Sequence, residues 1–384
     1  MMARNRRDFL KKGAATVCIA AGAVSAIPLV AKQVPKMAEP MQDMGLDMCL
    51  AYFWGIEPRK VALAKQMNVL GAVGGINPAM AGMPDTNAWD LAVIKGVQDA
   101  WRRQGLNLRV IEGPPSLGTA IKLGLPGRDE EIAHFITLMK NLASVGIDTI
   151  CYNWMPVINW ARTTLDRPSR GGALVSAFDI EDISNQEKFT EFGPLSPEIM
   201  WENLAYFLRA AIPEAEKYGV KLALHPDDPP IDEIRGIPRI MTSVKAFERL
   251  LDLYPSPSNG ITFCQGSFAS MGTNNIGVDI PATIRSFGKR NAIHFVHFRD
   301  VRGHATNFEE TFHDDGKTDM YEAMKCYYEV GYKGPIRPDH VPTMEGDPND
   351  KPGYSTIGTL FAIGYMRGLM EGVVKENAKP ISMQ

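Results

Sequence analysis

The sequence predicts a closed barrel of eight parallel β-strands, each followed by an α-helix. Short apolar runs rich in β-branched residues alternate with longer stretches in which apolar residues recur three and four positions apart. The alternation repeats eight times over a length that suits one barrel with insertions. An open doubly wound sheet is the alternative, but no G-x-G-x-x-G turn follows the first strand. We therefore expect a (β/α)8 barrel.

Eight apolar runs are the predicted strands, and several follow a glycine, as is common where a helix ends and a strand begins. After residue 196 a helix is expected, with Ser196 as its N-cap and Pro197 at its first position. Segment 154–195 carries Arg162, Arg167 and Arg170, and we expect it to form a lid or rim over the barrel mouth. The predicted strands span residues 47–54, 68–75, 107–113, 147–153, 219–225, 259–264, 292–298 and 334–340.

The N-terminus has the composition of an export signal. Residues 4–13 are basic, and residues 14–31 are apolar and small. The pair Arg6–Arg7 before this apolar run resembles a twin-arginine signal, and a plain membrane anchor is the alternative. We expect export to the periplasm and no stable membrane insertion after cleavage, or a cytoplasmic location if the signal is not functional. The predicted division is a signal at 1–31, a linker at 32–45 and a barrel domain at 46–384.

Composition excludes some partners. The 384-residue chain is 45% hydrophobic and 22% charged with a net charge of −3, so it offers no basic field for nucleic acid. We expect a small-molecule substrate and a homo-oligomer. The five cysteines are too widely spaced for a disulfide framework: Cys18, Cys49, Cys151, Cys264 and Cys326.

Four residues of metal-ligating type end four consecutive predicted strands. They are His225, Cys264, His297 and Asp339. Because the carboxyl ends of barrel strands meet at one face, these side chains are expected to converge there. Imidazole, thiolate and carboxylate are ligands of divalent transition metals. Taken singly, each could be a structural residue; together they predict one divalent metal per chain.

Strand alternation separates two histidines of the seventh predicted strand. His294 and His297 lie on opposite faces, and His297 is nearer the carboxyl end, so it is the predicted ligand. After His225, Pro226 ends the strand, and Asp227 and Asp228 are expected to orient ligands. The donor set suits Zn²⁺, and also Mn²⁺ or Fe²⁺ if coordination positions stay open.

With these residues the chain resembles the mannonate dehydratase family, whose fold is a xylose-isomerase-like barrel. The resemblance runs from about residue 47 to 375 and is carried by specific motifs. They are "IKLGLPGRD" (121–129), "CYNWMPVINWART" (151–163), "HPDDPP" (225–230), "FCQGS" (263–267), "HFRDV" (297–301), "ETFHDDG" (310–316), "DMYEAMK" (319–325), "RPDH" (337–340) and "PGYSTIG" (352–358).

The resemblance implies a lyase of hexuronate degradation, in which D-mannonate loses water to give 2-keto-3-deoxy-D-gluconate. It implies that Mn²⁺, or Fe²⁺, is held by the four strand-end residues, and that His340 and Tyr354 are catalytic. The chain departs from the family at Asn159, where an aspartate is expected, and in its export signal. The physiological substrate is therefore expected to be D-mannonate or a related hexonate.

The expected chemistry accounts for these residue types. A hydrogen beside a carboxylate is a weak acid, so its removal requires a cation near the carboxylate and a base. His340 is the candidate base with Tyr354 as a proton relay, and the assignment between the two is open. Two other functions stay open: a metal-dependent sugar isomerase or epimerase, and an exported sugar-acid binding protein without catalysis. Expected substrate contacts are Arg162, His313 and Arg299.

Overall fold

The computed structural model describes residues 44–274 and 277–378 of the chain. The predicted signal at residues 1–31 and the linker as far as residue 43 lie outside the described residues.

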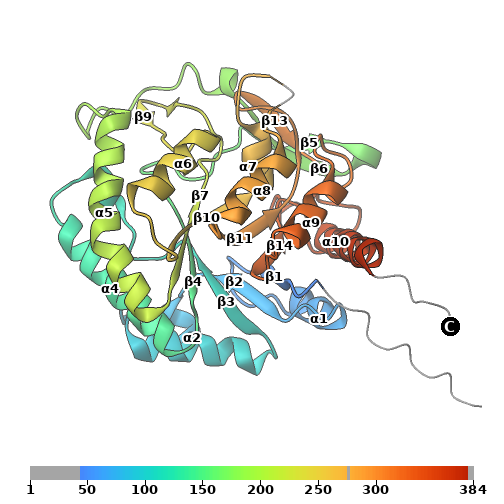
Figure 1. Ribbon diagram of the computed structural model, residues 1–384, viewed down its shortest axis with the longest axis horizontal. Coiled ribbons are helices and arrows are strands. Elements are labelled where there is room, and N and C mark those ends of the chain that lie inside the picture. The colour runs from blue at the N-terminus through green and yellow to red at the C-terminus, as the bar shows by residue number, and fades with distance from the viewer. Residues whose placement is uncertain (1–43, 275–276, 379–384) are drawn as a thin grey trace, which may run out of the picture. The chain divides into compact units, whose positions relative to one another are not determined.

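Eight parallel strands close into a barrel in the order β1-β14-β11-β10-β7-β4-β3-β2 (Figure 1). Each strand pairs with its two neighbours in parallel, so the predicted barrel is confirmed and the open sheet is excluded. The strands are β1 (Asp47–Ala51), β2 (Gly71–Gly74), β3 (Asn107–Glu112), β4 (Thr149–Asn153), β7 (Lys221–His225), β10 (Asn259–Cys264), β11 (Ile293–Phe298) and β14 (Pro335–Pro338).

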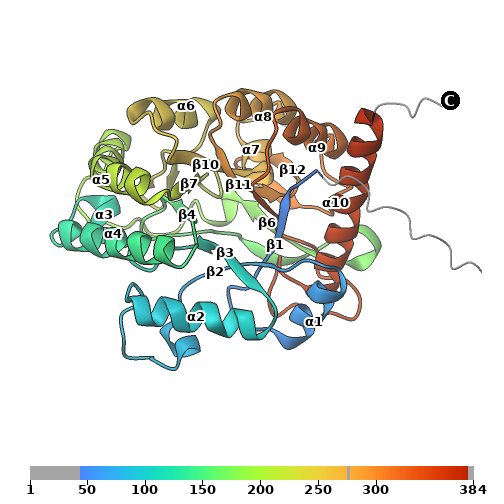
Figure 2. The same ribbon diagram turned by 60° about the horizontal axis from the view of Figure 1, so that its bottom comes forward.

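Helices surround the barrel (Figure 2). The connections contain the short helices α3 (Thr119–Leu123) and α7 (Gln265–Ser270). They also contain the 3₁₀ turns η1 (Pro78–Ala81), η2 (Arg170–Gly172) and η3 (Ile180–Asp182). The longer helices are α1 (Pro58–Gln66), α2 (Leu91–Arg103), α4 (Arg128–Ser144), α5 (Pro197–Tyr218), α6 (Val244–Leu253), α8 (Ile280–Lys289), α9 (Met320–Glu329) and α10 (Thr356–Asn377).

Helix α5 begins where its sequence predicts. The Ser196 hydroxyl accepts a hydrogen bond from the Ile199 amide at 3.3 Å, and Pro197 occupies the first turn. The cap satisfies one of the amides that lack a partner at a helix start, and proline needs no partner there. Local interactions thereby set the start of α5.

Two apolar layers form the core. One fills the space between strands and helices, and the other fills the barrel itself. Small side chains surround one large ring inside the barrel, so that the interior is packed and is not a channel. These buried interior residues are Cys49, Val73, Val110, Cys151, Ala223 and Phe295.

The insertion after β4 forms a second sheet. Strands β5 (Thr164–Pro168) and β6 (Leu174–Asp179) join β12 (Val301–His304) and β13 (Asn307–Glu310) in the antiparallel order β12-β13-β6-β5. A two-stranded ribbon of β8 (Glu233–Ile234) and β9 (Ile237–Pro238) follows β7. Asn159, Trp160 and Leu165 of the insertion line the cavity at the barrel mouth, which confirms the predicted rim.

The last strand is shorter than predicted. β14 ends at Pro338, so Asp339 and His340 lie just beyond it. His340 has a φ of +40°, in the left-handed region, which side chains other than glycine seldom adopt. The backbone therefore leaves the strand direction at these residues, and both side chains can face the same cavity.

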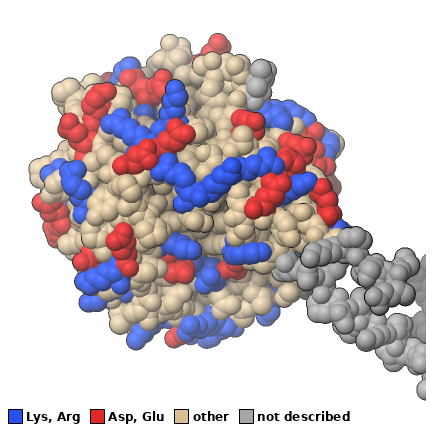
Figure 3. Space-filling view, in the orientation of Figure 1, with Lys and Arg blue, Asp and Glu red and all other residues tan. Residues whose placement is uncertain are grey.

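Two further features are the distribution of charge on the surface and the packing of the C-terminal helix. Basic and acidic side chains are interspersed over the face in Figure 3, in keeping with the small net charge. Helix α10 is long and apolar enough to cross a membrane by length and composition, but it packs against α9, α1 and β14. These contacts are those of an outer barrel helix.

Candidate active site

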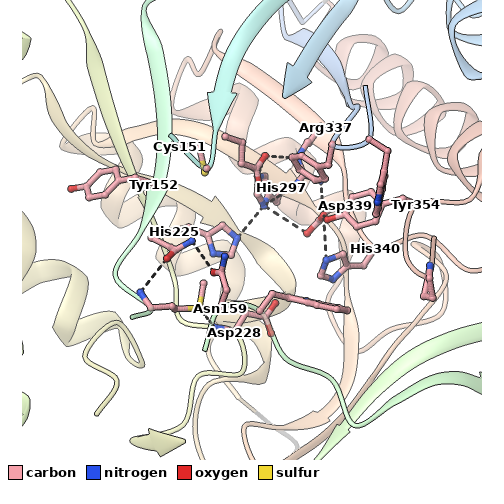
Figure 4. Close-up of a pocket in the computed structure, with 18 of the residues that line it drawn as sticks. Cys151, Tyr152, Asn159, His225, Asp228, His297, Arg337, Asp339, His340 and Tyr354 are labelled. Atoms are coloured by element: carbon pink, nitrogen blue, oxygen red, sulfur yellow. Dashed lines mark hydrogen bonds and ion pairs between the residues drawn. The ribbon is translucent and has the colours of Figure 1, made fainter. Parts of the chain in front are cut away.

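A cavity of about 390 Å³ opens at the carboxyl ends of the strands. Its polar lining includes the buried His297, Arg337 and Asp339, which lie close together (Figure 4), whereas its apolar Phe53, Trp54, Trp160 and Leu165 are exposed. The lining residues are Phe53, Trp54, Glu112, Gly113, Cys151, Tyr152, Asn153, Met155, Asn159, Trp160, Leu165, His225, Asp228, His297, Arg337, Asp339, His340, Pro352 and Tyr354.

Three of the predicted metal ligands converge at the base. Ligand atoms of His225, Cys264 and His297 all lie within 4.8 Å of one another. His225 Nε2 is 3.1 Å from His297 Nδ1, and the two rings, which come from β7 and β11, are tilted by 48° (Figure 4). Cys264 is fully buried behind the cavity wall. The structure thus brings together residues that are far apart in the chain.

Asp339, the fourth predicted ligand, lies next to two of these three residues. Its Oδ2 lies 3.8 Å from Cys264 Sγ and 3.7 Å from His297 Nδ1. Burial alone would raise the pKa of this carboxyl, but Arg337, His340, His297 and Arg299 hold it well below the usual range. Asp339 is therefore a carboxylate at neutral pH, as a metal ligand must be.

The donor set fits a divalent metal ion. His225 Nδ1 lies 2.7 Å from the Pro226 carbonyl, so it carries the proton and leaves the Nε2 lone pair facing His297. Burial also lowers the pKa of His225, which keeps the ring neutral. A neutral imidazole and a carboxylate beside a thiol form a site that could hold Mn²⁺, Fe²⁺ or Zn²⁺.

Glu112 and Arg337 support this set, and the sequence did not single them out. Arg337 donates to both oxygens of Glu112 at 3.0 and 3.3 Å and to Asp339 Oδ1 at 2.5 Å. Glu112 Oε2 also lies 3.5 Å from His297 Nε2. Burial would raise the pKa of Glu112, but Arg337 and His297 lower it to about 2. The one feature of the sequence that could have identified Glu112 as a site residue was its position at the end of β3.

Glu112 also belongs to a second group of metal-ligating type. Its carboxylate lies with Cys151 Sγ and His297 within 4.8 Å. However, burial raises the pKa of the Cys151 thiol well above its usual value. A cation there would face a neutral thiol, which is a poor ligand, so this group is the weaker candidate for a metal site.

His340 faces the candidate metal site from the side. Its Nδ1 lies 2.9 Å from Glu310 Oε1, so this nitrogen carries the proton. Its Nε2, left with a lone pair, lies 3.7 Å from Asp339 Oδ1. A carboxylate behind an imidazole fixes the tautomer and stabilises the ring when it gains a proton. An imidazole held in this way can accept a proton at Nε2, as the predicted general base must.

Tyr354 lies beside His340, near the same oxygen of Asp339. Its hydroxyl is 3.5 Å from Asp339 Oδ1, and its ring packs edge-on against the ring of His340 at 5.6 Å. Burial, and then the charge of Asp339, raises the pKa of the phenol well above its usual value. Tyr354 therefore keeps its proton and has one to donate.

The predicted substrate contacts Arg162 and Arg299 do not line the cavity. Both are buried and bind the same two carboxylates, Asp228 and Glu310, at distances of 2.5 to 3.0 Å. Arg299 Nε also lies 2.9 Å from Asp339 Oδ2. Their charges are directed at these carboxylates, and the predicted contact with substrate stays a prediction.

His313 is also absent from the cavity lining. It is fully buried and neither ring nitrogen has a hydrogen-bond partner with good geometry. Burial lowers its pKa to about 4, so the ring is neutral. Its predicted role as a substrate contact likewise stays a prediction.

The two aspartates after Pro226 differ in position. Asp228 binds Arg162 and Arg299, and through Arg299 it supports Asp339, as predicted for a residue that orients ligands. Asp227 instead accepts the Met241 amide at 2.8 Å and lies 3.6 Å from Arg239. Asp227 therefore holds the loop after β7 and does not orient the candidate ligands.

Asn159, the predicted departure from the family, lies in the cavity wall. Its Oδ1 accepts a hydrogen bond from the Asn153 side chain at 3.0 Å, and Asn153 Oδ1 in turn accepts from Lys122 at 3.0 Å. An aspartate at 159 would add a negative charge to this wall. The amide pair therefore makes the wall less acidic than the motif expects.

Comparison with known proteins agrees with this geometry. The profile of the D-mannonate dehydratase family matches residues 48–190 and 184–380. The mannonate dehydratase of Streptococcus uberis is 37% identical over 354 residues, covering 85% of this chain and 99% of that protein.

Solved structures agree as well. The crystal structure of mannonate dehydratase from Streptococcus suis serotype 2 matches with a TM-score of 0.78 and 34% identity, covering 87% of this chain and 96% of that one. A xylose isomerase domain protein from Planctomyces limnophilus matches at 13% identity with a TM-score of 0.52, covering 88% and 100%, which shows the shared barrel fold alone. The chain belongs to the D-mannonate dehydratase family and is a hydro-lyase.

Proposed function

We propose that this enzyme removes water from D-mannonate, or a closely related hexonate, to give 2-keto-3-deoxy-D-gluconate. One observation carries the proposal: His340 and Tyr354, the proposed base and acid, both lie within 3.7 Å of Asp339 Oδ1, beside the candidate metal ligands. A binding protein would need neither group. The family's activity supports the choice of substrate.

We propose that His225, Cys264, His297 and Asp339 hold one Mn²⁺ or Fe²⁺ ion. When bound, the ion would attract electrons from the substrate carboxylate and make the neighbouring hydrogen more acidic. Arg337 and Arg299 keep Asp339 charged and oriented for this role.

The residues of the chain then divide the proton transfers. His340 Nε2 takes the proton from C2, and Glu310 stabilises the imidazolium that results. Tyr354 donates its proton to the hydroxyl leaving C3, so that water departs. The C2–C3 double bond formed carries a hydroxyl at C2, and this enol becomes the 2-keto-3-deoxy acid in water.

The test is an assay of the purified protein against a panel of hexonates, with and without added Mn²⁺. A 2-keto-3-deoxy product from D-mannonate that requires the metal would support the proposal. Epimerised acid without loss of water would indicate the isomerase or epimerase alternative, and tight binding without any product would indicate a binding protein. Metal analysis in parallel distinguishes Mn²⁺ from Fe²⁺ and Zn²⁺.

We also propose that the chain is exported folded through the twin-arginine route. Folding before export would let the site take up Mn²⁺ in the cytoplasm, where tighter-binding ions such as Cu²⁺ and Zn²⁺ compete less. Stoichiometric zinc and no manganese in protein purified from the periplasm would contradict this order of events.

A further inference from the structure

Apolar side chains surround the opening of the active-site cavity. We call Phe53, Trp54, Trp160, Leu165 and Pro352 the apolar rim, and all five line the cavity. They come from three places in the fold: the loop after β1, the insertion with β5, and the segment between β14 and α10. Four of them are 37 to 53% exposed, which is unusual for aromatic and aliphatic side chains gathered at one place.

The apolar rim begins at the catalytic groups and extends outward. The rings of Phe53 and Trp54 pack against Tyr354 with centroids 5.3 and 5.4 Å apart, and the ring of Trp160 packs against His340 at 5.4 Å. A substrate with C2 and C3 at these two catalytic residues would therefore direct its remaining carbons toward the rim.

A free hexonate matches the apolar rim poorly. Each of its outer carbons carries a hydroxyl that loses hydrogen bonds to water when it enters an apolar site. The side-chain amides of Asn153 and Asn159 also line the cavity, and they bond to each other at 3.0 Å. This bond leaves them with fewer groups to bind the hydroxyls of a substrate. The polar base thus suits the acid end of the substrate, while the rim suits a group with an apolar face.

We propose that the preferred substrate is a hexonate that carries a further sugar ring on one of its C4 to C6 hydroxyls, and that the apolar rim binds this ring. The proposal rests on the dehydratase activity proposed above. One face of a sugar ring presents C–H groups with slightly positive hydrogens, which pack well on the negative faces of aromatic rings. Trp54 and Trp160 offer such rings in the cavity lining, 53% and 37% exposed, each with one cation over its ring, Lys351 and Arg162 respectively.

The extra ring takes no part in the reaction. The C2 hydrogen leaves as a proton to His340, the C3–O bond breaks, and the hydroxyl leaves as water with the proton of Tyr354. The glycosidic bond stays intact, so the product is a 2-keto-3-deoxy acid that still carries its sugar. No oxidant or reductant is needed.

The test compares two acids with the metal-loaded full chain: D-mannonate, and a mannonate bearing a glucosyl unit on its C4 or C6 hydroxyl. We expect kcat/KM to be higher for a glucosylated acid by about three- to tenfold, the usual gain from one stacked ring. Trp54→Ala and Leu165→Ala should lower this preference toward one. Tyr328→Ala removes an exposed aromatic ring of α9 away from the cavity and should leave the preference unchanged.

Each other result has a separate meaning. Product from free mannonate without any gain from the glucosyl unit would overturn the extended substrate and leave the dehydratase activity standing. Absence of product from both acids would overturn the dehydratase activity, and the extended substrate with it. If Trp54→Ala or Leu165→Ala converted a dimer into monomers in sedimentation, the rim would be a subunit contact and the proposal would be wrong.

Discussion

His297 connects two groups of polar side chains at the base of the cavity. Its Nδ1 faces His225 at 3.1 Å, and its buried Nε2 lies 3.5 Å from a Glu112 oxygen. Because a carboxylate attracts the imidazole proton, Nε2 carries it, and Nδ1 keeps a lone pair for the candidate metal site. Glu112 thereby determines which nitrogen of His297 is available.

Replacing Glu112 by Gln tests this role. The change keeps the shape but removes the charge that binds Arg337 and attracts the His297 proton. We expect metal affinity to fall by about 10- to 100-fold, as for other residues that orient metal ligands. Titration with Mn²⁺ measures the affinity, and circular dichroism checks the fold.

Asp47→Asn is the matched control, since Asp47 pairs with Arg109 at 2.6 Å at the opposite end of the barrel. It should leave metal affinity unchanged. An E112Q protein with the affinity of the unmodified chain would show that Glu112 does not position His297.

His340→Asn and Tyr354→Phe test the two proton transfers. Each variant should keep its metal and bind the sugar acid, while kcat falls by roughly 10²- to 10⁴-fold. If both act in one relay, the double variant should be little slower than the slower single one. Near-normal kcat in either metal-loaded variant would remove that residue from the mechanism.

At the scale of elements, the antiparallel sheet supports the active site as well as its rim. Glu310 ends β13, where it contacts His340, Arg162 and Arg299. β13 pairs with β12 on one side and with β6 of the insertion on the other. The position of Glu310, and with it the tautomer of His340, therefore depends on this sheet.

Gly303→Ala tests that dependence. Gly303 of β12 has a φ of +99°, and an added Cβ would lie 2.2 Å from the Asn307 carbonyl oxygen in β13. We expect the free energy of unfolding to fall by about 1–3 kcal/mol from the clash, besides about 1 kcal/mol from backbone strain. Activity should fall as β13 shifts.

Gly82→Ala separates the two effects. Gly82 has a φ of +72°, but nothing lies within 4 Å of its added Cβ. This variant should show the strain alone and keep full activity. Urea unfolding and kcat/KM measure both proteins, and equal losses would exclude a role for the β12–β13 clash.

At the scale of the whole molecule, the two ends of the barrel differ in their chemistry. His297 and His294 belong to the same strand, but His297 faces the cavity, whereas His294 is buried near the amino ends of the strands with Nδ1 3.2 Å from the Leu222 carbonyl. Burial lowers the pKa of His294 from 6.5 to about 4. One strand thus supplies a site residue and a structural histidine that must stay neutral.

This histidine predicts acid sensitivity. The unfolded chain binds a proton at His294 near pH 6.5, but the folded chain does so only near pH 4, so stability falls as the pH drops through that window. The loss reaches about 3 kcal/mol at full protonation. His294→Gln should have a smaller difference in urea unfolding between pH 7 and pH 4.5. An unchanged difference would assign the acid sensitivity to other groups.

Export can be tested on the whole chain. Replacing Arg6 and Arg7, which lie outside the described residues, by Lys should trap folded, metal-loaded protein in the cytoplasm. Cell fractionation with metal analysis measures the outcome. Normal export of the Lys-Lys chain would indicate a general secretory signal or a membrane anchor.

Local patterns in the sequence determined the barrel and the base of its site. Apolar runs of strand length, separated by amphipathic helices, have few other ways to bury their surfaces, so the eight strands could be predicted within a few residues. The convergence of His225, Cys264 and His297 followed because parallel strands end at one face of a barrel. The boundary of β14 was missed by two residues, since a left-handed His340 is not visible in composition.

Only the tertiary structure decided which charged groups face the cavity. Arg162 and Glu310 are 148 residues apart and Glu112 and Arg337 are 225 apart, yet each pair is in hydrogen-bond contact. No local period relates such residues, because an ion pair forms wherever the fold buries two opposite charges together. The sequence by itself determined where strands end and which metal-ligating residues end them. The fold decided that Arg162 and Arg299 would bind carboxylates, and that Glu112 and Glu310 would orient the histidines.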